Sequence, residues 1–283
     1  MKLGLALSGG GIRGVAHIGV LKALEESGIK IDIIGGTSSG GLIASLYAMD
    51  YSPSYIYYLF ERYSKDIVNI SNGAIINGIR NYMVSKKFNI SGIKDGIKIE
   101  NLYNELAKKK NVYYMKDIKM PIAIPSIDIA EAKEYIFSNI IPKDEKDAKY
   151  ITDIPVGRAV RASSSFPAVF CPCEFKNHMF LDGGTLANVP TDEVKSLGAD
   201  KVISVNFESS KLDKSSDVID IVMRTVDIMG NKISESGLKN SDYILTIPME
   251  KVGLLDDTKT ESCFKQGYET TMQKINEIKK VLL

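Results

Sequence analysis

A serine near the start of the chain lies at the centre of a glycine-flanked turn, with the sequence GTSSG at residues 36–40. Its G-x-S-x-G spacing is typical of a nucleophile elbow, in which the serine occupies a strained turn and its hydroxyl projects from the top of a sheet. Here the serine is Ser38, Gly36 and Gly40 relieve crowding around it, and the amide of Ser39 faces the same way. The alternative interpretation is that Ser38 only caps the helix that follows.

A second glycine-rich turn, GGGIRG at residues 9–14, precedes the serine in the chain. Between a strand and a helix, its N–H groups and the helix dipole can form an oxyanion hole, and its glycines leave room for a tetrahedral centre. The same G-x-G-x-x-G spacing occurs in dinucleotide-binding turns, where Arg13 would suit a phosphate and an acidic residue follows. Asp32 lies 18 residues after Gly14, but at the start of its strand rather than the end. A tight turn without a ligand is the third interpretation.

Activation of Ser38 requires a base, and the chain has only two histidines, His17 and His178. A triad in the chain order serine, acid, histidine would combine Ser38 with Asp128 and His178. We expect both histidines to be structural instead, because His17 falls on the first helix and His178 in a polar turn before a strand.

The other candidate base is a carboxylate. Asp182, followed by Gly183 and Gly184, stands at the end of an apolar strand, where α/β sheets gather their ligand groups. An aspartate is a weak base at its usual pKa of about 3.9. It becomes useful if burial raises that pKa and if the carboxylate reaches the serine hydroxyl. Taken alone, an Asp-Gly-Gly tripeptide is also a common turn.

The chain around the first two motifs alternates between short apolar runs and helical patterns. An apolar run at 3–8 leads into the glycine turn, and a helical pattern follows from Val15 to Leu24. A second apolar run at 31–34 leads into the serine turn, and an apolar helix follows at 42–49. This repeated order of strand, turn and helix predicts an α/β protein, a three-layer α/β/α fold with a mostly parallel central sheet.

Later in the chain, the pattern predicts further elements and one irregular region. Residues 64–100 are punctuated by glycines, and we expect a lid or an insertion there, after a tyrosine-rich helix at 51–63. The expected strands lie at 121–130, 134–138, 179–181, 201–207 and 243–247, and the expected helices at 101–109, 156–162, 218–233 and 262–283.

The composition is that of an ordinary globular protein, with 44% of the 283 residues hydrophobic and 25% charged. A formal net charge of +1 argues against a nucleic-acid partner. The three cysteines lack metal-ligand spacing, so we expect free thiols and neither a metal nor another cofactor. The first apolar run is too short for a signal peptide and no stretch suits a transmembrane segment, so we expect a soluble, cytoplasmic protein. We expect a single domain over residues 1–283, in which the C-terminal helices and strand of residues 208–283 pack against the rest.

Together, the three motifs resemble those of the patatin family of acyl hydrolases, which is also similar to the catalytic module of the cytosolic phospholipases. GGGIRG at 9–14, GTSSG at 36–40 and DGG at 182–184 occur in the family's order. The sequences RASSSFPAVF at 161–170 and NVP at 188–190 resemble the family's as well. The resemblance extends from residue 3 to about residue 207.

The resemblance implies a phospholipase A, a lysophospholipase or a lipid esterase that uses a serine–aspartate dyad without histidine or metal. The substrate would be a lipid or phospholipid, met through transient contact with a membrane surface to which 51–63 and 66–83 contribute. Ser38 would be the nucleophile, Asp182 the base, and Gly9, Gly10, Gly11 and Arg13 the oxyanion loop, with Gly14, Gly36, Gly40, Gly183 and Gly184 shaping the three turns.

Two other functions stay open on the sequence alone. A catalytically idle relative would bind lipid in the same pocket. A nucleotide-binding protein would use the glycine loop and leave the other two motifs without a role. Met223, Met229 and Met249 are candidates for the lining of an acyl pocket, although methionine more often fills gaps in a core.

Overall fold

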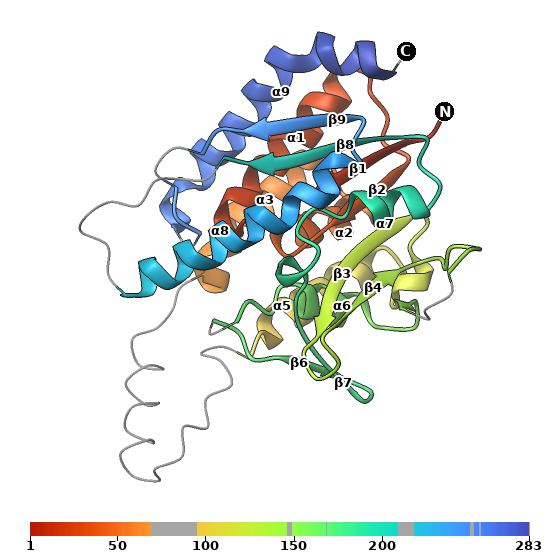
Figure 1. Ribbon diagram of the computed structural model, residues 1–283, viewed down its shortest axis with the longest axis vertical. Helices are drawn as coiled ribbons and strands as arrows, with labels where there is room; N and C mark the ends of the chain where they lie inside the picture. The colour runs from red at the N-terminus through yellow and green to blue at the C-terminus, as the bar shows by residue number, and fades with distance from the viewer. Residues whose placement is uncertain are drawn as a thin grey trace.

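The structure is a computed structural model (Figure 1), and it describes residues 1–68, 95–145, 149–167, 169–208, 218–249, 252–254 and 256–282. Its main feature is a nine-stranded sheet with helices on both faces. The strands are β1 Leu3–Leu7, β2 Ile33–Gly36, β3 Ile122–Asp128, β4 Lys133–Ser138, β5 Tyr150–Ile151, β6 Cys173–Phe175, β7 His178–Asp182, β8 Lys201–Phe207 and β9 Tyr243–Ile247.

The strands follow the order β5-β4-β3-β2-β1-β8-β9, and β7 pairs with β3 and β6 outside this path. The centre of the sheet is parallel, because β1 pairs in parallel with β2 and β8, β2 with β3, and β8 with β9. β3 pairs antiparallel with both β4 and β7. The prediction of an α/β fold with a mostly parallel central sheet is confirmed.

Two hydrophobic cores lie on the two faces of the sheet, because side chains alternate along each strand. On β1, Leu5 and Leu7 point into the larger core, and Ala6 points into the smaller one. The larger core lies under α1, which packs on α3 and α9, while α7 and α8 lie on the other face (Figure 1). The helices are α1 Val15–Glu26, α2 Ser39–Ala48, α3 Pro53–Val68, α5 Ile97–Lys109, α6 Val156–Ser163, α7 Thr191–Ser196, α8 Val218–Lys239 and α9 Thr260–Leu282.

The edge of β3 that faces β2 is shared by two strands. Near the start of β3, Ala123 pairs with Gly35 of β2. Further along, Ser126 pairs with Asp182 of β7, which runs antiparallel to β3. The carboxyl ends of β2 and β7 therefore approach each other along β3, and the turns that follow them, GTSSG and DGG, meet at one place.

Most predicted elements are present, with shifted ends. Among the strands and α-helices of the described residues, β5, β6 and α7 were not predicted by sequence patterns. The predicted lid or insertion at 64–100 falls mostly outside the described residues, which resume at Asp95, and α5 occupies its end. In the described part of the chain, no helix combines the length and the apolar composition that a membrane span requires.

Candidate active site

Ser38 sits in a strained turn between β2 and α2. Its backbone has φ 53° and ψ −121°, a left-handed φ that non-glycine residues rarely adopt. Its side chain makes no capping hydrogen bond to α2, so the interpretation of Ser38 as a simple helix cap is wrong. The turn is held by the Ser38 amide, which donates to Ser163 Oγ at 3.1 Å. The α2 dipole places partial positive charge beside the serine hydroxyl.

The glycines on either side of Ser38 are required by close backbone contacts. A Cβ on Gly36 would collide with the backbone of Gly40, and a Cβ on Gly40 would collide with the carbonyl oxygen of Leu7. The turn can therefore fold against β1 only without side chains at these two positions. This packing supports the sharp bend that exposes the hydroxyl of Ser38.

Asp182 ends β7 and points into the same space as Ser38. The residue is only 3% exposed, and its Oδ1 accepts a hydrogen bond from the Gly184 amide at 2.8 Å. Burial raises its pKa to about 6, against smaller lowering effects of the Ser38 hydroxyl and the Gly184 amide. The Ser38 hydroxyl is thus near the carboxylate, but no hydrogen bond of ordinary geometry joins them, and within the described structure Oδ2 has no partner. Oδ2 is therefore an open acceptor beside the serine.

The glycine loop offers two amides to the site. Gly9 does not contribute its own, because its N–H donates to the carbonyl oxygen of Asn188 at 3.1 Å. Across the described residues, the amides of Gly10 and Gly11 have no hydrogen-bond acceptor. Both residues line the cavity that contains Ser38. These two N–H groups can stabilise an anionic oxygen there.

Arg13 follows the three glycines of the loop and lines the same cavity. Its side chain is buried, its Nε donates to the carbonyl oxygen of Gly10 at 3.3 Å, and its guanidinium carbon lies 5.9 Å from the centre of the Phe207 ring. In a trans peptide the C=O and the next N–H point in opposite directions. By holding the Gly10 carbonyl, Arg13 turns the Gly11 amide away from itself. The sequence predicts Arg13 as part of the oxyanion loop, and in the structure its side chain hydrogen-bonds the glycine turn of that predicted loop.

Ser38, Asp182 and the glycine loop open into one cavity of about 360 Å³. Met229 contributes to its wall, as predicted, whereas Met249 packs in the larger core and the side chain of Met223 lies outside the described residues. A mainly apolar cavity of this size suits an apolar small-molecule group. The apolar part of its wall includes Leu42, Phe60, Ile99, Phe166, Val169, Phe170, Phe207, Met229 and Ile233.

Neither histidine is among the described residues that line the cavity. His17 is fully buried, its Nε2 is 2.8 Å from the carbonyl oxygen of Ser8, and burial lowers its pKa to about 4. His178 begins β7 and Asp182 ends it, which separates them by roughly 13 Å along the strand. The triad of Ser38, Asp128 and His178 is therefore wrong, because His178 lies at the far end of β7 from the serine.

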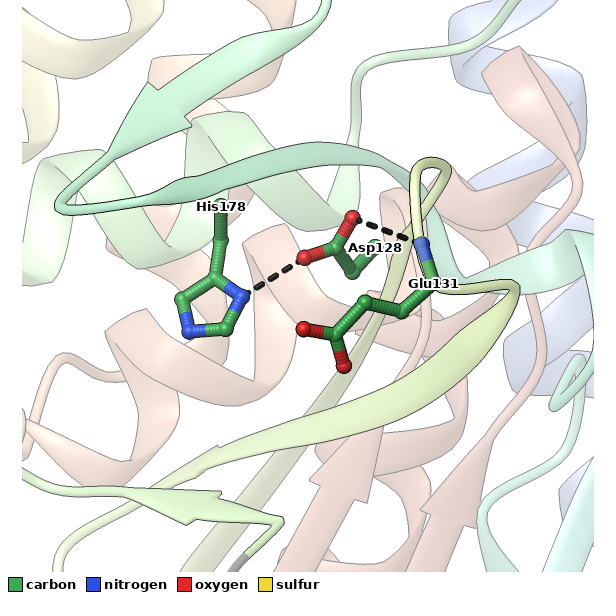
Figure 2. A group of neighbouring side chains, drawn as sticks. All are labelled: Asp128, Glu131 and His178. Carbon is green, nitrogen blue, oxygen red and sulfur yellow. Dashed lines mark hydrogen bonds and ion pairs between the residues drawn. The ribbon is translucent and has the colours of Figure 1, made fainter.

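His178 instead pairs with Asp128 at the turn between β3 and β4, where Glu131 also lies (Figure 2). Atoms of these three residues that could ligate a metal lie within 4.8 Å of one another. Each already has a protein partner: Asp128 accepts from His178 at 2.6 Å and from the Ala130 amide at 2.8 Å, and Glu131 accepts from the Tyr135 hydroxyl at 3.0 Å. These contacts fasten β7 to the β3–β4 turn.

The dinucleotide interpretation of the glycine loop requires an acid near the loop, and Asp32 is at the wrong end of the sheet. Its carboxylate accepts the Leu3 amide at 3.0 Å, at the start of β1, whereas the glycine loop follows Leu7 at the end of β1. These ends of the strand are roughly 13 Å apart. Asp32 therefore cannot contact a ribose whose phosphates bind the loop.

Comparison with known proteins places this chain in a family. The family model described as "Patatin-like phospholipase" matches residues 5–195. The chain is 32% identical over 212 residues to "Lysophospholipase NTE1" of Scheffersomyces stipitis, covering 74% of this chain and 12% of that protein. It is 30% identical over 209 residues to "Patatin-like phospholipase domain-containing protein 7" of Rattus norvegicus, covering 73% of this chain and 14% of that protein. The chain thus spans a small part of these relatives.

The fold has counterparts among solved structures. The crystal structure of VipD from Legionella pneumophila superposes with a TM-score of 0.52 at 14% sequence identity, covering 98% of this chain and 67% of that one. At this identity the likeness concerns the fold alone. The match of the family model over most of the chain, with the three motifs inside it, shows that this protein belongs to the patatin-like phospholipase family.

Proposed function

We propose that this protein is a serine acyl hydrolase that cleaves fatty acyl esters of lipids with Ser38 as the nucleophile and Asp182 as the base. The observation that carries the proposal is the open, buried Oδ2 of Asp182 beside the strained Ser38 in an apolar cavity. With a pKa of about 6, Asp182 is mostly ionised at neutral pH and is still basic enough to accept a proton.

The first half of the reaction forms an acyl-enzyme. Oγ of Ser38 bonds to the ester carbonyl carbon while its proton passes to Oδ2 of Asp182. The electron pair of the C=O bond moves onto the carbonyl oxygen, and the amides of Gly10 and Gly11 stabilise that charge. The intermediate collapses, the bond to the leaving alcohol breaks, and Asp182 returns the proton to the alcohol oxygen.

The second half repeats these steps with water. Asp182 takes a proton from a water molecule as the water oxygen bonds to the acyl carbon. The bond to Ser38 Oγ then breaks, the proton returns to Oγ, and the fatty acid leaves. The two active-site residues end in their starting states.

The cavity and the named relatives support lipid esters as substrates. The wall beyond Ser38 is apolar, which suits a fatty acyl chain. The relatives named above are a lysophospholipase and a phospholipase-domain protein. We therefore propose a phospholipase A, lysophospholipase or related lipid esterase. Met229, which lines the cavity, is 58% exposed, and Leu186, which follows the cavity-lining Thr185, is 50% exposed. These exposed apolar side chains support a transient contact with a lipid surface.

The experiment compares ester hydrolysis by the wild type, Ser38→Ala and Asp182→Asn, with p-nitrophenyl esters and lysophosphatidylcholine. We expect both variants to lose at least roughly 10³-fold in kcat, as removal of a nucleophile or its base does in other serine hydrolases. Ser45→Ala is the matched control, because Ser45 is a buried serine on α2 whose hydroxyl donates to the Leu42 carbonyl oxygen of the same helix. Lipid binding without turnover by the wild type would instead indicate an idle lipid-binding relative.

A further inference from the structure

Asn188 touches the glycine loop and a helix that walls the cavity. It follows Asp182 by six residues, between the Asp-Gly-Gly turn and α7, and its half-buried side chain lines the cavity. None of the reaction steps above uses this residue. Its contacts raise the question of what it holds in place.

The backbone at Asn188 fastens the two turns that carry the chemistry. The carbonyl oxygen of Asn188 accepts the Gly9 amide at 3.1 Å. The preceding carbonyl, of Ala187, accepts the Thr37 hydroxyl at 2.7 Å, next to Ser38. The glycine loop and the serine turn are thus tied to one short segment that follows the base.

The side chain of Asn188 reaches α8, which forms one wall of the cavity. Its Nδ2 donates to Ser234 Oγ at 2.8 Å, and that hydroxyl donates to the carbonyl oxygen of Gly230 at 2.7 Å. Ser234 is buried, and Gly230 and Ser234 both line the cavity with Met229. The Asn188 amide therefore fixes the position of α8 relative to Ser38 and Asp182.

The other end of the amide packs against both glycine turns. A Cβ on Gly9 would lie 2.7 Å from Asn188 Oδ1, and one on Gly184 would lie 3.2 Å from it. The side chain thus fills the space that two glycines leave open. A shift of Asn188 would move the glycine loop, the base turn and α8 together.

We propose that Asn188 is a positioning residue that holds the oxyanion loop and α8 against the dyad, and that α8 thereby sets how well a long acyl chain is accepted. The proposal rests on the proposed function. A short acyl group meets only the loop and the dyad, whereas a longer chain also meets the wall that α8 forms. Loss of the amide therefore affects both classes of ester, and loss of its partner on α8 affects long chains most.

The test measures kcat and KM for p-nitrophenyl butyrate and p-nitrophenyl laurate in Asn188→Ala, Asn188→Asp and Ser234→Ala. The matched control is Asn240→Ala, because Asn240 is an exposed asparagine just after α8 whose Nδ2 donates to Asp192 on α7 at 2.7 Å. Both asparagines thus make an amide hydrogen bond of similar length, one at the cavity and one at the surface.

We expect both Asn188 variants to lose about tenfold in kcat on both esters, the effect of one buried hydrogen bond. Ser234→Ala should lose about fivefold in kcat/KM on the laurate and less than twofold on the butyrate. Asn240→Ala should match the wild type. Wild-type-like kinetics in the Asn188 variants, or equal losses of Ser234→Ala on both esters, would overturn the proposal.

Two further measurements keep the proposal testable if an Asn188 variant does not fold or if the wild type is inactive. If an Asn188 variant fails to fold by circular dichroism, the ratio of laurate to butyrate rates in Ser234→Ala decides, since a purely structural role lowers both rates equally. If the wild type neither hydrolyses an ester nor reacts with a fluorophosphonate, the proposed function is wrong. In that case, amide hydrogen exchange still tests whether Asn188 holds the glycine loop and α8 in place. Asn188→Ala must speed exchange in both Gly9–Gly11 and α8, and unchanged exchange contradicts the proposal.

Discussion

Ser38 and Asp182 face one cavity from two strands that meet end to end along β3. Ser38 follows β2, which pairs with β3 through Gly35 and Ala123, and Asp182 ends β7, where it pairs with Ser126. Two residues that are far apart in the chain thus come together because an antiparallel strand enters the sheet where a parallel one leaves it. This arrangement places a buried carboxylate beside the serine.

The first prediction concerns the pH dependence of hydrolysis. A base must be ionised to accept the serine proton, and burial raises the pKa of Asp182 to about 6. We expect kcat/KM to rise tenfold per pH unit below that value and to reach a plateau above it. Initial rates on a soluble ester across this range provide the measurement. A profile that is flat through pH 6 would show that another group, or none, controls the rate.

The second prediction concerns stability. The folded-state pKa of Asp182, about 6, lies above its ordinary value of 3.8. The stabilisation that the neutral carboxyl group gives the folded state is therefore fully present below pH 3.8 and is lost as pH rises through 6. At neutral pH the buried charge therefore destabilises the fold. Asp182→Asn should raise the free energy of unfolding at pH 7 by about 3 kcal/mol and change it little below pH 4.

Urea unfolding of the wild type and Asp182→Asn at pH 7 and below pH 4 measures this difference in the free energy of unfolding. A variant that is less stable than the wild type at neutral pH would mean that the carboxylate stabilises the fold.

The third prediction concerns Arg13, which we expect to act through the glycine loop. Arg13→Lys keeps the positive charge but removes the Nε–H that holds the Gly10 carbonyl. The Gly11 amide then loses its fixed direction, and we expect kcat to fall about tenfold or more with a smaller change in KM. Arg62→Lys, at an exposed position on α3, is the control. Equal kinetics in the two variants would rule out this supporting role.

The fourth prediction concerns His178 and Asp128. Burial raises the pKa of Asp128, but the hydrogen bonds from His178, Ala130 and Glu131 together lower it below its ordinary value. We expect His178→Gln to reduce the melting temperature by a few degrees while kcat stays within about twofold of the wild type. We also expect a chelator to leave hydrolysis unchanged. A large loss of kcat in a folded His178→Gln variant would mean that His178 takes part in catalysis.

The three motifs and the fold class follow from local sequence. A glycine turn after an apolar run, repeated at GTSSG, predicts a strand–turn–helix unit, and β1, α1, β2 and α2 have this form. Ser38 and Asp182 were identified in the same way, each at the end of a strand. Local patterns suffice here because each turn depends on its own glycines.

The missed features depend on contacts between distant segments. β5 and β6 have two and three residues, too few for a visible alternation. The hydrogen bond from the Gly9 amide to Asn188 and the contact of Arg13 with the Phe207 ring depend on how distant segments pack against the glycine loop. No periodicity of the sequence encodes this packing. Asn188 stood next to a recognised motif, but its link to α8 appears only in three dimensions.

The most direct test of the central claim is mass spectrometry of the protein after reaction with a long-chain alkyl fluorophosphonate, which traps an activated serine. We predict one adduct, on the peptide that contains Ser38, and labelling that is at least roughly 100-fold slower in Asp182→Asn. An adduct on another residue, or equally fast labelling of Ser38 in Asp182→Asn, would contradict the serine–aspartate dyad.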